Sequence, residues 1–263
     1  MTALGVPSPC KIDIHNLHKA YLVNGQSVDV LAGINLCAGP ESFVTLIGPS
    51  GCGKSTLFSI ICGLQQPNRG EIRVDGVPVA QRLGLVGYMP QRDLLLPWRH
   101  VLDNVILGPE IHGEDLAAAR EEARGLLPLF GLEGFGHSYP TALSGGMRQR
   151  AALLRTFLCR KQLMLLDEPF GALDAITRNT LQEWLLEVWQ RFRYTILFIT
   201  HDVEEAVFLS DKVYVLSPRP AHVDLELPIP LPRPRQRQMA VTPEFAALKQ
   251  QLLQALADNP RTG

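Results

Sequence analysis

The chain has 263 residues, of which 46% are hydrophobic and 19% charged, and its formal net charge is −1. This length allows one large or two small globular domains, and the charge argues against nucleic acid or an anionic membrane surface as a partner. The five cysteines are scattered, with no CxxC pair and no adjacent His cluster. That pattern argues against metal ligation and a disulfide framework and favours a reducing cytoplasm.

No segment has the pattern of a targeting or membrane-spanning sequence. The first 15 residues lack the basic stretch and apolar run of a signal peptide. No uncharged apolar run reaches the length of about 18 residues that a membrane helix needs. A role at a membrane would therefore require another chain.

The first third of the chain alternates short β-like runs with turns that contain Gly, Asn and Pro. The predicted strands are Lys11–Leu17, Val28–Leu36, Ser42–Gly48, Glu71–Val74 and Gly84–Met89. A helix is predicted from Gly53 to about Leu64.

The sequence GPSGCGKST lies between the third of these strands and the helix, and it fits the phosphate-binding pattern G-x-x-x-x-G-K-[ST]. Glycines let backbone amides surround phosphates, and the start of the helix adds a positive field. Lys54 would reach the β- and γ-phosphates, and Ser55 would ligate Mg²⁺. The predicted ATP-binding residues here are Gly48, Ser50, Gly51, Cys52, Gly53, Lys54, Ser55 and Thr56.

From Asp93 to Arg160 the pattern becomes helical, and after it strands and helices alternate. The predicted helices are Glu114–Leu129, Gly145–Arg160, Ala175–Phe192 and Val203–Leu209. The predicted strands are Gln162–Asp167, Thr195–Thr200 and Lys212–Leu216. This alternation predicts a mainly parallel sheet with helices on both faces.

The strand-like run LMLLDEP ends in two carboxylates. An apolar strand that ends in Asp places a carboxylate at the edge of a parallel sheet where ligands bind. Asp167 would hold Mg²⁺ through water, and Glu168 would accept a proton from the attacking water or orient it.

The tail has two parts. Pro218–Arg237 is rich in Pro and Arg, and a stiff solvated connector is favoured over a polyproline ligand for another protein. Thr242–Asp258 should form a helix that Thr242 caps, with Pro243 at its first position.

A second set of motifs carries a resemblance to the ABC ATPases. LSGGMRQR resembles the signature of that family, and its residues are Leu143, Ser144, Gly145, Gly146 and Met147. Further matches follow the order of the family. Tyr21 resembles the aromatic residue that stacks on adenine, and Gln91 resembles the glutamine of the Q-loop. Gly171–Asp174 resembles the D-loop, in which Asp174 is the acidic residue. His201 resembles the switch histidine, and Ser210–Lys212 matches the stretch beyond it. Met147 in place of glutamine, Gly171 in place of serine and the inserted Pro40 depart from the family pattern, but none removes a group required for hydrolysis.

The resemblance covers residues 11–220 and implies a fold and a mechanism. The fold would be α/β, with a P-loop NTPase (RecA-like) core, an N-terminal antiparallel β subdomain and an inserted helical subdomain at about 93–160. Residues 221–263 would form a Pro/Arg-rich connector and a helix. Glu168, His201 and Gln91 would be catalytic, with Gln91 also near the metal. ATP and Mg²⁺ would be the cofactors. Two copies would pack head to tail, so that the signature of each copy contacts the ATP bound by the other copy.

The segment Asp93–Trp98 and the C-terminal Pro-Arg segment resemble importers of the nitrate, sulfonate, taurine and bicarbonate group, and pyrimidine-precursor importers look similar. In those proteins the apolar segment receives a helix of the membrane partner. Core of the helical subdomain is the alternative for Leu94–Trp98, and both interpretations can hold for different residues. The alternatives for the whole chain are an exporter ATPase, a soluble ABC ATPase of repair, translation or iron–sulfur assembly, and a metabolite kinase.

The importer interpretation implies three partners and no nucleic acid. The chain would work with a second copy of itself, an integral membrane permease and, indirectly, a substrate-binding protein. It would lie peripherally on the cytoplasmic face of the inner membrane. The transported substrate is not encoded in any residue pattern of this chain.

Overall fold

The computed structural model describes residues 10–171 and 173–258, and these form two compact units. Unit 1 contains the described residues up to Val86 and from Arg193 onward, and unit 2 runs from Gly87 to Phe192. Two sets of residues discussed above lie outside the described residues. They are residues 1–9, where a signal peptide would begin, and Ala172 of the predicted D-loop.

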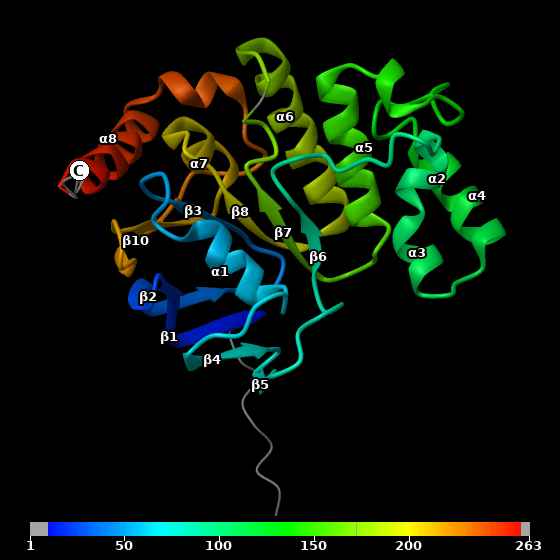
Figure 1. The fold of residues 1–263 in the computed structure, drawn as a ribbon. Coiled ribbons are helices and arrows are strands. Elements are labelled where there is room, and N and C mark those ends of the chain that lie inside the picture. The colour runs from blue at the N-terminus through cyan, green and yellow to red at the C-terminus, as the bar shows by residue number, and fades with distance from the viewer. Residues whose placement is uncertain (1–9, 172, 259–263) are drawn as a thin grey trace, which may run out of the picture. The chain divides into compact units, whose positions relative to one another are not determined.

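An antiparallel sheet with the strand order β2-β1-β4-β5 forms one layer of unit 1 (Figure 1). Its strands are β1 (Ile12–Val23), β2 (Gln26–Ala38), β4 (Arg69–Val74) and β5 (Val77–Pro78). The first two strands are longer than predicted because they continue to a tight turn at Asn24 and Gly25, both with positive φ. Glycine and asparagine tolerate this backbone region best, so the turn closes the hairpin.

Parallel strands form a second layer of unit 1. Strand β3 (Phe43–Ile47) pairs in parallel with β8 (Thr195–Ile199) and with β9 (Lys212–Leu216). Every residue of β3 and β8 is buried, as expected for strands that are covered on both faces. Helices α1 (Lys54–Ile61) and α7 (Val203–Leu209) follow β3 and β8.

The tail does not form the predicted solvated connector. Residues Val223–Pro228 form β10, which pairs antiparallel with β9. Arg235 is only 7% exposed, and it donates to the carbonyl oxygens of Val207 (3.2 Å) and Ser210 (2.9 Å) at the end of α7. Arginine satisfies these end-of-helix carbonyls, which otherwise lack partners. The Pro-Arg composition had predicted a solvated segment, whereas Arg235 is buried and has a structural role.

The last helix agrees with the sequence. Helix α8 spans Pro243–Ala257, and the Thr242 hydroxyl accepts a hydrogen bond from the Phe245 amide at 3.3 Å. Helix α8 packs on α7, where Lys249 and Glu204 form an ion pair at 2.8 Å. The short 3₁₀ helix η2 (Arg237–Val241) leads into it.

Unit 2 combines two parallel strands with a group of helices. Strand β6 (Gly87–Met89) pairs with β7 (Leu163–Asp167). The helices are α2 (Val101–Val105), α3 (Leu107–Ile111), α4 (Leu116–Leu126), α5 (Gly145–Phe157) and α6 (Ala175–Phe192), with the 3₁₀ helix η1 (Pro140–Ala142) before α5. Figure 1 shows α2, α3 and α4 grouped beside α5. The short helices α2 and α3 were not individually predicted, because five residues carry too little periodicity.

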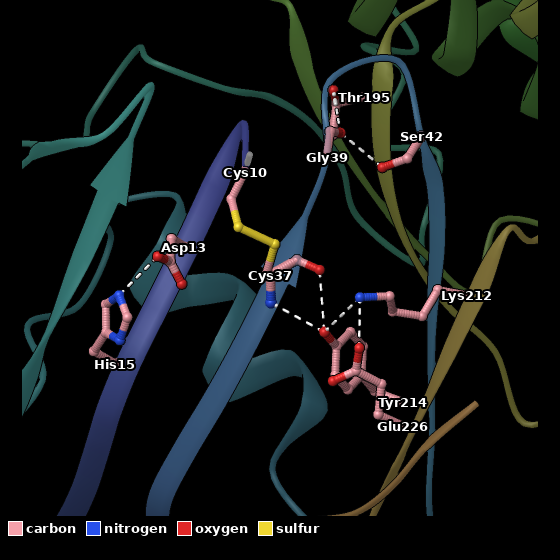
Figure 2. Close-up of a disulfide and its surroundings, with 10 residues drawn as sticks. All are labelled: Cys10, Asp13, His15, Cys37, Gly39, Ser42, Thr195, Lys212, Tyr214 and Glu226. Atoms are coloured by element: carbon pink, nitrogen blue, oxygen red, sulfur yellow. Dashed lines mark hydrogen bonds and ion pairs between the residues drawn. A yellow bond between two sulfur atoms is a disulfide. The ribbon is translucent and has the colours of Figure 1, made fainter. Parts of the chain in front are cut away.

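A disulfide joins Cys10 to Cys37, contrary to the expectation from the scattered cysteines. The two residues are 27 apart in sequence, but the antiparallel pairing of β1 and β2 brings their Cα atoms to 5.6 Å. Sequence spacing therefore gave no sign of the bond. Figure 2 shows that the Tyr214 hydroxyl from β9 contacts both the amide and the carbonyl oxygen of Cys37, each at 3.1 Å. The three other cysteines, Cys52, Cys62 and Cys159, are not disulfide-bonded.

Across the described residues, none of the helices combines the length and apolar character needed to cross a membrane.

Candidate functional site

The predicted phosphate-binding loop connects β3 to α1 within unit 1. Its glycines are required by close contacts: a Cβ on Gly48 would lie 2.8 Å from the Leu216 carbonyl oxygen, and one on Gly53 would lie 2.9 Å from the side chains of Val30 and Leu31. Gly53 also has φ of 124°. Only glycine fits at these positions, so the loop follows the tight path of a glycine-rich phosphate-binding turn.

The charge of the loop comes from Lys54, which is buried at 7% exposure. Its Nζ donates to the carbonyl oxygens of Gly48 (2.8 Å) and Pro49 (3.0 Å), so the amine lies over the loop. Ser55, in the first turn of α1, is exposed. Cys52 is buried at 2% exposure, with its sulfur 3.8 Å from the same amine. The structure thus brings the predicted cation and hydroxyl to the start of one helix.

Tyr21 lies on β1 of the same unit. Its hydroxyl donates to Gln65 Oε1, and the Lys19 ammonium lies 5.0 Å from the centre of its ring. The ring is only partly buried. Its role as a platform for adenine remains a prediction.

His201 follows β8 at the carboxyl end of the strand, next to the phosphate-binding loop in the strand order. Strands β3 and β8 are parallel neighbours, and the Thr200 amide donates to the Leu46 carbonyl oxygen at 3.3 Å. Asp202 then caps α7 through hydrogen bonds from Glu204 and Glu205. The exposed His201 therefore emerges at the same edge of the sheet as the loop after β3, as ligand-binding residues of parallel sheets do.

Unit 2 brings Gln91 and Glu168 together, although they are 77 residues apart. Gln91 follows β6 and Glu168 follows β7, and the Gln91 Nε2 atom donates to Glu168 Oε2 at 3.2 Å. Glu168 has a positive φ of 45°, which costs a residue with a side chain on the order of 1 kcal/mol, and strained backbone of this kind clusters at functional sites. Asp167, at the end of β7, is 5% exposed. Two of the three predicted catalytic residues thus share one edge of unit 2.

The predicted signature lies at the start of α5. The Ser144 hydroxyl oxygen accepts a hydrogen bond from the Met147 amide at 3.2 Å, and Ser144 is the N-cap. A hydroxyl that accepts at the cap can still donate its own proton. The N-terminus of α5 therefore offers that proton and unpaired amides to an anion. Leu143, which precedes the cap, is buried at 4% exposure.

Two of the predicted residues in unit 2 also have structural roles. A Cβ on Gly146 would lie 3.0 Å from Thr177 Cγ2, so this glycine allows α5 to pack on α6. Asp174 accepts hydrogen bonds from the amides of Ile176 (3.1 Å) and Thr177 (3.0 Å). These bonds, with Thr177 contributing most, lower the pKa of the Asp174 carboxyl. Packing and capping explain both residues in part without any ligand.

The segment Asp93–Trp98 divides as the two interpretations allow. Leu94 is 57% exposed and Trp98 is 71% exposed, whereas Leu95 is buried. Asn104, which is fully buried, holds the segment in place: its side chain accepts from the Leu96 amide at 2.6 Å and donates to three carbonyl oxygens between Leu96 and His100. Sequence reasoning missed Asn104; the one available signal was an amide side chain within an apolar helical run.

The donor set fits a magnesium nucleotide. No group of three or more His, Cys, Asp and Glu within the described residues could hold a metal ion alone. Mg²⁺ bound with a nucleotide usually takes only one or two protein ligands and keeps oxygen donors from phosphate and water. The Ser55 hydroxyl in unit 1 and the Asp167 carboxylate in unit 2 are each a hard oxygen donor of that kind.

Comparison with known proteins identifies the family. The ABC transporter family model matches residues 31–171. An ABC transporter ATP-binding protein of Methanocaldococcus jannaschii is 46% identical over 213 residues, covering 81% of this chain and 80% of its own. The taurine import ATP-binding protein TauB of Pseudomonas putida is 46% identical over 199 residues, 76% of each chain. The formylaminopyrimidine import ATP-binding protein ThiZ of Halalkalibacterium halodurans is 43% identical over 196 residues, 74% of this chain and 76% of its own.

Solved structures agree with the fold. A bacterial ABC transporter cassette determined as a dimer has a TM-score of 0.73 and 29% identity, covering 83% of this chain and 98% of its own. The same cassette in a dimeric post-hydrolysis state, bound to ADP and Pi, has a TM-score of 0.72 and 28% identity over the same shares. The α/β cassette fold predicted from the sequence is confirmed by these matches. Together with the family model over residues 31–171, they establish that this chain belongs to the ABC transporter family.

Proposed function

We propose that this chain is the ATP-hydrolysing subunit of a membrane importer and works as a head-to-tail dimer of two copies. The observation that carries the ATPase assignment is the hydrogen bond between Gln91 and Glu168, which places an amide and a carboxylate together after two parallel strands. The phosphate-binding loop with Lys54 and the neighbouring His201 complete the set of groups that hydrolysis requires.

In unit 1, the loop binds and orients the nucleotide. Loop amides between Gly48 and Thr56 would surround the phosphates, Lys54 would contact the β- and γ-phosphates, and the Ser55 hydroxyl would be a ligand of Mg²⁺. Tyr21 offers a ring face to adenine. Mg²⁺-bound ATP supplies the phosphoryl group and the charge neutralisation that the reaction needs. His201, at the adjacent strand end, donates a hydrogen bond to the γ-phosphate.

In unit 2, Glu168 orients the attacking water and accepts its proton. Gln91 fixes the orientation of the Glu168 carboxylate through their hydrogen bond, and its side-chain oxygen would be a ligand of Mg²⁺. The Asp167 carboxylate would hold Mg²⁺ through water. The left-handed backbone of Glu168 aims its side chain in a direction that an ordinary helix start would not allow.

The signature completes the site of the other copy. Leu143, Gly145, Gly146 and Met147 surround the Ser144 cap, whose proton and neighbouring amides would reach the γ-phosphate bound by the partner copy. ATP would then hold the two copies together, and Asp174 of the D-loop would stabilise that interface. The dimeric solved relatives support this arrangement.

The importer assignment is supported by the similarity to TauB and ThiZ, both named as import ATP-binding proteins. The exposed Leu94 and Trp98 provide an apolar surface for a helix of an integral membrane permease. We place the chain peripherally on the cytoplasmic face of the inner membrane. A substrate-binding protein would deliver the solute, with taurine-like sulfonates and pyrimidine precursors as the first classes to test. Residues 1–220 would form the ATPase domain and 221–263 a C-terminal extension.

A pull-down from the native host tests the importer assignment. The tagged chain is recovered in mild detergent, and bound proteins are identified by mass spectrometry. A Leu94→Asp, Trp98→Ala variant serves as the control, since it should lose a membrane partner without altering the nucleotide residues. Recovery of a multi-span membrane protein with the parent chain alone is the expected result. Recovery of only soluble partners would refute the importer assignment.

A further inference from the structure

The arginine at position 219 contacts the phosphate-binding loop from a segment far along the chain. Its Nε donates a hydrogen bond to the Gly51 carbonyl oxygen, 168 residues earlier. A Cβ built on Gly51 would lie 3.7 Å from Arg219 Nη2, so the guanidinium lies beside the backbone at the tip of the loop. The sequence alone predicts only a Pro-Arg-rich connector at this position.

The tip itself is a turn that several groups hold. The Cys52 amide donates to the Pro49 carbonyl oxygen at 3.2 Å, and the Lys54 amine donates to the same oxygen at 3.0 Å. The bond from Arg219 fixes a second carbonyl oxygen of the turn, that of Gly51. Because the carbonyl oxygens of Pro49 and Gly51 are bound from the protein side, the orientation of the peptides between them is constrained.

The segment that carries Arg219 is itself anchored in unit 1. The Ala221 amide donates to the Val30 carbonyl oxygen, and the Ala32 amide donates to the Ala221 carbonyl oxygen, each at 2.8 Å. The Ser217 amide donates to the His222 carbonyl oxygen at 3.0 Å. Val30 is also one of the side chains that pack against Gly53 of the loop. Arg219 therefore extends from a fixed turn, and little ordering is needed for it to reach Gly51.

The electrostatics of the turn also point to an anion. Among the described residues, neither Lys54 nor Arg219 forms an ion pair with a carboxylate within 4.0 Å. Two cations thus face one four-residue turn, and their hydrogen-bond partners are neutral: three carbonyl oxygens and the sulfur of Cys52. Carbonyl dipoles satisfy the hydrogen bonds but leave the net positive charge, which favours a polyanion nearby.

From this geometry we infer that Arg219 is a positioning residue of the nucleotide site. It holds the turn Pro49–Cys52 in the conformation that presents loop amides to the phosphates, and its charge raises the affinity for a nucleoside triphosphate. This inference rests on the proposed ATPase function. Arg219 acts through the loop, so its loss weakens nucleotide binding in the ground state and the transition state alike. A loss of that kind raises KM and leaves kcat nearly unchanged.

The test compares Arg219→Ala and Arg219→Lys with the parent chain in steady-state ATP hydrolysis. Arg219→Ala should raise the KM for ATP about fivefold, the scale of one charge-assisted hydrogen bond at an exposed position, with kcat changed less than about twofold. Arg219→Lys keeps the charge without the planar fork and should recover part of the loss. Arg73→Ala is the matched control: it removes an exposed arginine of unit 1 that pairs with Glu71.

The salt dependence separates a charge effect from a merely structural one. The KM of the parent should rise with ionic strength more steeply than that of Arg219→Ala, because the variant lacks the screened charge. An unchanged KM in Arg219→Ala, or equal effects of the Ala and Lys variants accompanied by a lower melting temperature, would overturn the inference.

The same comparison is made with equilibrium binding of a fluorescent ATP analogue. If the parent binds the analogue but does not hydrolyse ATP, the proposed function fails, while the affinities of the variants still decide the role of Arg219.

Discussion

Removing the Cys10–Cys37 bond should destabilise unit 1 without a comparable effect on unit 2. The bond closes a loop with a sequence separation of 27, and the chain-entropy relation gives about 3.5 kcal/mol for a loop of this length. For a protein of about 250 residues, 1 kcal/mol shifts the melting temperature by about 3 °C. A Cys10→Ala, Cys37→Ala variant should therefore melt about 10 °C lower in the transition of unit 1.

The tryptophans allow the two units to be followed separately. Trp98, Trp184 and Trp189 all lie in unit 2, whereas both bonded cysteines lie in unit 1. Circular dichroism reports both units, so the shift should appear there, and tryptophan fluorescence should shift less if the units unfold independently. Dithiothreitol should lower the stability of the parent to that of the variant and leave the variant unchanged.

A thiol count provides the decisive check. In denaturant without a reductant, the parent chain should show three reactive thiols, from Cys52, Cys62 and Cys159. Disulfides are rare in reducing compartments. The bond therefore requires an oxidising environment, whereas the proposed cytoplasmic location is reducing. If protein isolated rapidly from its host under alkylating conditions contains five alkylated thiols, the bond does not form in the host. If dithiothreitol does not change the stability of the parent, the bond does not stabilise the protein.

Three smaller perturbations test local packing. Asn104→Ala should lower the free energy of unfolding by about 3 kcal/mol in urea titrations, because it leaves the buried backbone groups around Leu96 without partners; a loss below about 1 kcal/mol would contradict the network. Burial raises the pKa of the Cys159 thiol. In the folded protein the alkylation rate of this thiol should therefore still rise about tenfold per pH unit up to pH 9. A rate that reaches a plateau below pH 8 would contradict the raised pKa. Thr242→Ala should cost about 1 kcal/mol through the lost cap of α8, whereas Thr242→Ser should cost little by the same titration.

Long or strongly punctuated elements could be predicted from the sequence with accurate ends. Helix α6 and strand β9 begin and end at the predicted residues, because charges and turn residues bound clear apolar patterns there. Strand β10 was missed since its prolines and alternating charges resemble a solvated segment, and only the edge of β9 provides its partner.

Contacts that depend on the tertiary fold were beyond sequence reasoning. The acidic end of the strand-like run predicted Glu168 and the family resemblance predicted Gln91, but their hydrogen bond follows from the pairing of β6 with β7. The Cys10–Cys37 bond likewise follows from the pairing of β1 with β2. Periodicity describes which face of an element is apolar, and it does not specify which distant residues meet.

The most direct test of the account is the behaviour of Glu168→Gln with ATP. This variant retains the shape of the side chain but removes the base, so nucleotide should bind and persist. Light scattering after size exclusion should show a species of twice 29.1 kDa in Mg²⁺-ATP and a monomer in ADP, and a second change, Ser144→Ala, should weaken the dimer. Hydrolysis at the parental rate, or a monomer in saturating ATP, would contradict the assignment of Glu168 and of a dimer held together by ATP.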